Sequence, residues 1–108
     1  MCGISGIINQ KNNIINKEDI IAINNLATHR GPDGEGYYHD QNLSFGHRRL
    51  AIIDLTENGH QPMSYNKDFI ITYNGEIYNY IELKKKLKSF NWKFKTNSDT
   101  EVLAFAWK

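Results

Sequence analysis

The second residue of the chain is its only cysteine, and this position could supply the thiol with a base of its own. Residue 2 is small, so the initiator Met1 can be trimmed, which leaves Cys2 at the N-terminus. At about pH 8 an α-amino group is substantially neutral and can accept the thiol proton, directly or through water. A lone cysteine is more often a small buried hydrophobe. Its place between Met1 and Gly3 reduces the weight of that alternative but leaves both interpretations open.

Asn74 and Gly75 follow the apolar segment 69–73, which we expect to be a strand. An amide side chain and an unhindered backbone N–H at the end of a strand point outward together. Such a pair is a competent oxyanion hole for a tetrahedral intermediate. The alternative is that Asn-Gly only forms a tight turn, which is the commoner use of this dipeptide.

Two charged residues are further candidates for ligand binding. Arg49 directly precedes an apolar segment that we expect to be a buried strand, where its two parallel N–H groups could hold a carboxylate. A solvated charge pair is the alternative. Asp99 follows Ser98 at an expected helix start, where its carboxylate could receive an ammonium group or simply cap the helix.

Other classes of site are not supported by the sequence. The spacings of the cysteine and of His29, His39, His47 and His60 match no usual zinc pattern, so we expect no metal site. The glycines of segment 31–36 form no phosphate-binding fingerprint. A formal net charge of +1 argues against capture of nucleic acid or membranes. Without a signal peptide or a long apolar run, the chain is expected in the cytoplasm.

Strands and helices are mixed without a regular alternation. We expect helices over 16–28, from 79 or 80 to 89, and from about 98, and strands over 3–9, from 37, over 43–47, 49–54 and 69–73, and within 90–94. The last helix starts with Ser98 and Glu101 in the spacing of a capping box. The sequence ends at Lys108 without a Gly or Pro stop signal, so we expect it to be part of a longer protein.

Six segments then occur in one order along the chain: MCGISG (1–6), HRGPD (29–33), HRRLAIID (47–54), GHQPM (59–63), YNGEIYN (73–79) and SDTE (98–101). Together they resemble the N-terminal glutaminase domain of the glutamine-hydrolysing asparagine synthetases. The wider group is the class II amidotransferases, which are N-terminal-nucleophile hydrolases. Each segment alone is a weak signal, but six in order are specific, and they span essentially the whole chain.

The resemblance implies an α+β fold, a four-layer αββα sandwich with two antiparallel sheets, of which residues 1–108 are the N-terminal part. It implies that Cys2 attacks the side-chain amide of glutamine and that Asn74 and Gly75 bind the oxyanion. Arg49 would hold the α-carboxylate of glutamine, and Asp99 would hold its α-ammonium group. The remaining implied pocket residues are Leu50, Ile52, Ile53 and Glu76.

The function implied is hydrolysis of glutamine to glutamate and ammonia, with the ammonia used for ATP-dependent asparagine synthesis from aspartate. ATP and magnesium would belong to a C-terminal synthetase domain of the same protein, outside residues 1–108, and no cofactor is expected within them. The assembly could be a homodimer. Two alternatives stay open: a glutaminase that serves a different acceptor, such as a sugar or an antibiotic precursor, and a non-catalytic binding module.

Overall fold

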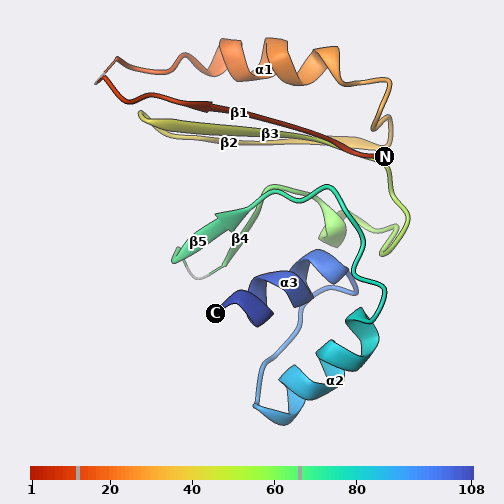
Figure 1. Ribbon diagram of the computed structural model, residues 1–108. Helices are drawn as coiled ribbons and strands as arrows, with labels where there is room; N and C mark the ends of the chain where they lie inside the picture. The colour runs from red at the N-terminus through yellow and green to blue at the C-terminus, as the bar shows by residue number, and fades with distance from the viewer. Residues whose placement is uncertain (12, 66) are drawn as a thin grey trace.

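A three-stranded antiparallel sheet with one helix on its face forms the N-terminal part of the fold. The computed structural model describes residues 1–11, 13–65 and 67–108. The sheet has the order β1-β3-β2, and Figure 1 shows the helix α1 lying along one face of it. These elements are β1 (Gly3–Ile8), α1 (Lys17–Leu26), β2 (Gly34–His39) and β3 (Leu43–Arg49). Strand β2 begins three residues earlier than expected, inside the glycine-rich segment.

A small hairpin and two helices form the rest of the structure. They comprise η1 (Glu57–Gly59), β4 (Met63–Tyr65), β5 (Phe69–Ile71), α2 (Tyr80–Ser89) and α3 (Asp99–Trp107). The hairpin β4-β5 lies between the three-stranded sheet and α3 (Figure 1). The layers therefore follow the order helix, sheet, sheet, helix, which agrees with the expected α+β class and αββα arrangement.

The antiparallel pairing of β1 with β3 decides where the thiol lies. Gly3 pairs with Arg48, so the residue before β1 meets the end of β3. Side chains of β1 alternate between two environments: Gly3 is buried, whereas Ile4 and Ile8 are 52% and 70% exposed. The expectation of a buried strand over 3–9 was therefore correct for the strand and wrong for its burial.

Helix α1 packs on the sheet through a narrow face that includes a polar residue. Ile20 and Asn24 are fully buried, whereas Leu26 is 79% exposed. Asn24 is tolerated in this core because its amide is satisfied on both sides. Ser5 Oγ donates to Asn24 Oδ1 over 3.2 Å, and Asn24 Nδ2 donates to the His47 carbonyl over 3.3 Å. These two bonds fix α1 to β1 and to β3.

The second core is an aromatic cluster around Phe105 of α3. Its ring centroid lies 4.6 Å from that of Trp92 and 5.0 Å from those of Tyr65 and Phe94. The strand expected within 90–94 does not form. Its aromatic residues were the signal for a strand, but Trp92 and Phe94 instead pack on Phe105 from an irregular segment, and Phe90 is exposed.

The strand expected over 49–54 is also absent, because side chains take the backbone groups that a sheet would need. Leu50 N–H donates to Cys2 Sγ, and Ala51 N–H donates to the Asp33 carboxylate over 2.9 Å. The chain then turns at Asp54, whose φ of 55° lies in the left-handed region. Residues 50–54 are therefore a loop, which begins where β3 ends at Arg49.

Helix α3 starts at the expected residue, although only half of the expected capping box forms. Ser98 Oγ accepts from Thr100 N–H over 3.1 Å, as an N-cap should. The Glu101 side chain, which is fully buried, turns to the preceding loop instead. It accepts from the backbone N–H groups of Lys95 and Thr96 over 2.9 and 2.7 Å. Glu101 thus holds the chain that leads into α3.

We expect Glu101→Ala to lower the free energy of unfolding by about 1–3 kcal/mol, because two partly buried backbone donors lose a charged acceptor. Chemical denaturation of both proteins measures this difference. Glu82→Ala is the matched control, since Glu82 lies exposed on α2 and should change stability by no more than about 0.5 kcal/mol. Equal stability losses in the two variants would contradict the anchoring role of Glu101.

Candidate active site

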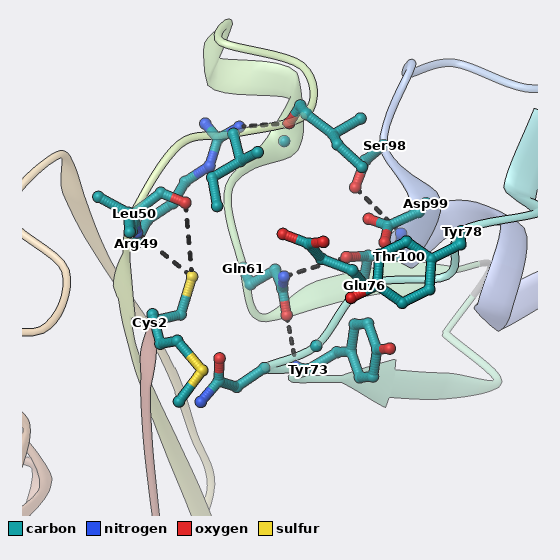
Figure 2. A pocket seen from close by; sticks show the side chains of 16 residues that line it. Cys2, Arg49, Leu50, Gln61, Tyr73, Glu76, Tyr78, Ser98, Asp99 and Thr100 are labelled. Atoms are coloured by element: carbon teal, nitrogen blue, oxygen red, sulfur yellow. Dashed lines mark hydrogen bonds between the residues drawn. The ribbon is translucent and has the colours of Figure 1, made fainter.

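One cavity joins the two parts of the fold, and every residue predicted for the site lines it. Its volume is about 310 Å³. The predicted residues on its wall are Cys2, Arg49, Leu50, Ile52, Ile53, Asn74, Gly75, Glu76 and Asp99. Figure 2 shows Cys2 on one side and Ser98, Asp99 and Thr100 on the other. These residues come from the position before β1, from the end of β3 and the loop after it, from the segment after β5 and from the start of α3.

Cys2 is held where β1 begins beside the end of β3. Its sulfur accepts from Leu50 N–H over 3.2 Å, and its carbonyl accepts from Arg30 Nε over 3.2 Å. The sulfur also lies 3.6 Å from the Leu50 carbonyl oxygen, to which a thiol can donate. Met1 lines the same cavity. Removal of Met1 would therefore leave the α-amine of Cys2 at the cavity, beside its own thiol.

Asn74 and Gly75 lie on the cavity wall in the segment that follows β5. The strand ends at Ile71, two residues before the predicted end, so Tyr73 belongs to the same irregular segment. A Cβ atom at Gly75 would lie 2.5 Å from the Tyr73 hydroxyl oxygen. A side chain at this position would displace the Tyr73 ring, whereas glycine leaves the ring in place and its own backbone N–H unhindered.

Arg49 is buried, with 6% of its surface exposed, which excludes the alternative of a solvated surface charge. Its guanidinium donates to the carbonyl groups of Thr56 (2.6 Å), Ile53 (3.4 Å) and Asp54. A Cβ at Gly59 would overlap the guanidinium, so glycine is needed beside it. Arg49 therefore shapes the loop that carries three of the predicted pocket residues, in addition to lining the cavity itself.

Asp99 is 6% exposed and brings a carboxylate to the wall opposite Cys2 (Figure 2). One oxygen, Oδ2, accepts from Ile77 N–H over 3.0 Å. The other oxygen has no hydrogen-bond partner among the residues that the structure describes. Glu76 lines the same cavity and is exposed. Two carboxylates and one guanidinium thus surround a space that suits a small zwitterion.

Sequence reasoning assigned no role in the site to several residues of the cavity wall: Gly59, Gln61, Tyr73, Tyr78, Ser98 and Thr100. Gln61 is the most connected of them. Its Oε1 accepts from Tyr73 N–H over 2.5 Å, and its Nε2 donates to Thr100 Oγ1 over 3.1 Å (Figure 2). The GHQPM segment was noticed as a motif, but nothing in its local pattern indicates these partners, which lie far along the chain.

Metal-binding and membrane-spanning features are not found in the described parts of the chain. Over residues 1–11, 13–65 and 67–108, no three His, Cys, Asp or Glu side chains gather in a way that could hold a metal ion. None of the helices in these ranges has the length and hydropathy needed to cross a bilayer.

Comparison with known proteins gives one family. The model of a glutamine amidotransferase domain matches residues 1–108. The glutamine-hydrolysing asparagine synthetase 1 of Bacillus subtilis is 49% identical over 107 residues, which cover 95% of this chain and 17% of that protein. The glutamine-hydrolysing asparagine synthetase 2 of rice is 44% identical over 107 residues, 96% of this chain and 17% of that protein. The chain thus spans about a sixth of the length of these relatives.

Proposed function

We propose, from the premise that this chain belongs to the glutamine amidotransferase domain family, that it hydrolyses glutamine to glutamate and ammonia with Cys2 as the nucleophile. One observation carries the proposal. A single cavity brings together Cys2, the amide of Asn74, the N–H of Gly75 and the carboxylate of Asp99. A thiol, a candidate oxyanion hole and charged groups for a zwitterionic substrate are the parts that amide hydrolysis by thioester formation needs.

The reaction proceeds in two balanced halves. The Cys2 sulfur adds to the amide carbon of glutamine while the thiol proton passes to the α-amine, and the carbonyl oxygen becomes an oxyanion. Breakage of the C–N bond returns that proton to the departing nitrogen, which gives ammonia and a γ-glutamyl thioester. Water then adds to the thioester with loss of a proton to the α-amine. Breakage of the C–S bond releases glutamate and the thiol.

Binding of glutamine uses the charges that surround the cavity. Asp99 would receive the α-ammonium group through the oxygen that Ile77 does not occupy. Arg49 would hold the α-carboxylate with N–H groups beyond those on loop carbonyls, since a guanidinium has five. The loop from Leu50 to Ile53 would line the chain of the substrate, with Glu76 nearby.

The names of the relatives suggest where the ammonia goes. The similar proteins of Bacillus subtilis and rice are named glutamine-hydrolysing asparagine synthetases, so we assign the ammonia to asparagine synthesis from aspartate. We expect this synthesis to use ATP and magnesium. We assign both to a synthetase domain outside residues 1–108, as well as the use of the ammonia. We expect the reaction in the cytoplasm and leave a homodimer as one possible assembly.

The test is release of glutamate and ammonia from glutamine, in equal amounts, by protein whose intact mass shows that Met1 is gone. Rapid quenching with acid should trap an adduct of one glutamyl group on Cys2. Protein that lacks Met1 and binds glutamine without releasing glutamate would contradict the proposal and favour a binding module. If glutamate is released but the ammonia is not used in asparagine synthesis, the proposed hydrolysis is retained and asparagine synthesis is excluded as the use of the ammonia.

We expect Arg49→Lys to raise the KM for glutamine by about 10–100-fold, the scale of one or two lost charge-assisted hydrogen bonds. Lysine keeps the charge but cannot reproduce the planar fork. The effect on kcat should be smaller, because these contacts exist in the ground state and in the transition state. Steady-state kinetics of glutamate release measure both constants.

Arg48→Lys is the matched control for this change. Arg48 is the neighbouring arginine and forms an ion pair of 2.8 Å with exposed Glu35, outside the cavity. Its side chain is 12% exposed and also donates to the Asn24 carbonyl of α1 over 3.3 Å, so thermal unfolding is measured alongside. The KM should stay within about threefold, because Arg48 does not line the cavity. A normal KM in Arg49→Lys would remove Arg49 from glutamine binding.

A further inference from the structure

The backbone of Tyr73, the residue directly before Asn74, is held from two sides by buried side chains. Its N–H donates to Gln61 Oε1 over 2.5 Å. Its carbonyl oxygen lies 3.3 Å from His47 Nε2. A carbonyl can only accept, so Nε2 must carry the proton of the imidazole. Both peptide groups of Tyr73 are therefore fixed by side chains rather than by a sheet partner.

Gln61 connects this segment to the helix that carries Asp99. Gln61 Nε2 donates to Thr100 Oγ1 over 3.1 Å, and Thr100 lies in the first turn of α3. The Gln61 backbone is itself confined, because a Cβ at Gly36 of β2 would overlap the Gln61 carbonyl. The Gln61 side chain thus fixes the Asn74 segment relative to the opposite wall of the cavity.

His47 is the counterpart of Gln61 from the side of β3. Its side chain is 1% exposed and does not line the cavity, so it cannot touch a substrate there. Burial lowers the pKa of His47 below its usual value; the bond to the Tyr73 carbonyl opposes this shift, and the charges of Arg49 and His60 add to it, so the net direction agrees with a neutral ring. Its Nδ1 is buried without a hydrogen-bond partner among the described residues. The bond from Nε2 to the Tyr73 carbonyl is therefore the hydrogen bond that the ring forms among the described residues.

We propose that His47 and Gln61 are positioning residues that clamp the Tyr73 backbone and thereby aim the Asn74 amide and the Gly75 N–H at the carbonyl bound by Cys2. We call these two side chains the Tyr73 clamp. The effect of these residues on catalysis depends on the proposed glutaminase function. Oxyanion donors act only from a narrow range of positions, and a displacement of about 1 Å can cost about 10²-fold in rate. No sheet hydrogen bond holds residues 73–75, so the clamp supplies what a strand would otherwise supply.

The test compares variants that keep or remove each contact. His47→Gln keeps a donor, since an N–H at the end of a glutamine side chain can reach the place of Nε2, whereas His47→Leu removes the donor. Gln61→Met keeps the shape of the side chain and removes both of its hydrogen bonds. Ser44→Ala is the matched control: Ser44 is a buried residue of the same strand, and His39, at 2.6 Å, is the one hydrogen-bond partner of its hydroxyl among the described residues.

Glutamate release should show a fall of about 10–100-fold in kcat for His47→Leu and Gln61→Met, with the KM for glutamine within about threefold. His47→Gln should recover most of the kcat, and Ser44→Ala should keep it. A merely structural role would instead lower activity in proportion to thermal stability in all four variants. Normal kcat in stable His47→Leu or Gln61→Met overturns the proposal.

Amide hydrogen exchange at Tyr73 gives a second readout that does not depend on turnover. Loss of the Gln61 acceptor should speed exchange of the Tyr73 N–H by about five- to tenfold, while amides in α1 keep their rates. If the unaltered protein releases no glutamate, the proposed function fails, and this exchange rate still decides whether the clamp exists. Unchanged exchange in Gln61→Met overturns the clamp, as does the failure of His47→Gln to restore kcat. If His47→Leu does not fold, Gln61→Met carries both measurements.

Discussion

Cys2→Ala should reduce glutamate release from glutamine to the background of the assay, a loss of up to about 10⁶-fold, the scale on which an enzyme loses its nucleophile. The physical reason is that no other thiol can replace it, since Cys2 is the only cysteine of the chain. Synthesis driven by added ammonia should survive in the protein that carries the synthetase activity, because that step bypasses the thioester. Both activities are measured on the same preparation of the variant.

The control for this variant must separate loss of the nucleophile from loss of the fold. Cys2 Sγ accepts one backbone hydrogen bond, from Leu50, so its removal should affect stability only mildly. Thermal unfolding and the intact mass should therefore be measured alongside, the latter to show that Met1 is gone in both proteins. Substantial glutamate release by a folded Cys2→Ala protein would rule out the assignment.

Local signals predicted the residues of the cavity better than they predicted the strands. Cys2, Asn74 and Asp99 were recognised because their neighbours reveal them: an initiator methionine, a following glycine and an N-cap serine. All three line one cavity in the structure. The order of the helices was predictable for the same reason, since caps and apolar periodicity are local. The roles assigned to these residues stay predictions until the variants are measured.

The wrong strands have a different cause. Periodicity assigns a strand wherever apolar or aromatic residues gather, but it does not show which groups will claim the backbone. The segment after Arg49 is apolar enough for a strand, yet the sulfur of Cys2 and the carboxylate of Asp33 take its N–H groups. The aromatic segment around Trp92 does not form a strand, because Trp92 packs on the ring of Phe105, which is more distant in sequence. Tertiary contacts outweighed local preference in both places.

The connections that hold the cavity together were the least predictable part of the molecule. Gln61 reaches Tyr73 and Thr100, and His47 reaches Tyr73, over long distances along the chain. Nothing in a single sequence indicates such pairs, because each residue alone is compatible with an ordinary loop or strand. Sequence reasoning therefore found the chemical groups of the candidate site and missed the side chains that position them.

Asn74→Ala should lower kcat for glutamate release by about 10²–10³-fold, which corresponds to about 2.7–4 kcal/mol, the scale seen when one oxyanion donor is removed. The amide of Asn74 would donate to an oxygen that carries full negative charge only during the reaction. Affinity for glutamine should therefore change much less than kcat. The fold should tolerate the change, because no hydrogen bond from the Asn74 side chain is found among the described residues, and the Tyr73 clamp holds the backbone independently. Measurement of kcat, glutamine binding and thermal unfolding on the same protein tests all three expectations.

Asn42→Ala is the matched control, since Asn42 is exposed at the turn between β2 and β3, on a part of the chain that does not line the cavity. This control measures how much stability is lost when an asparagine in a turn is replaced by alanine, and it should leave kcat unchanged. If Asn74→Ala loses activity only in proportion to its loss of stability, Asn74 merely shapes a turn. If Asn74→Ala is stable and keeps its kcat, the oxyanion must be bound by other donors. A large loss of kcat in a stable protein that still binds glutamine is the one result that an oxyanion donor, and not a turn residue, produces.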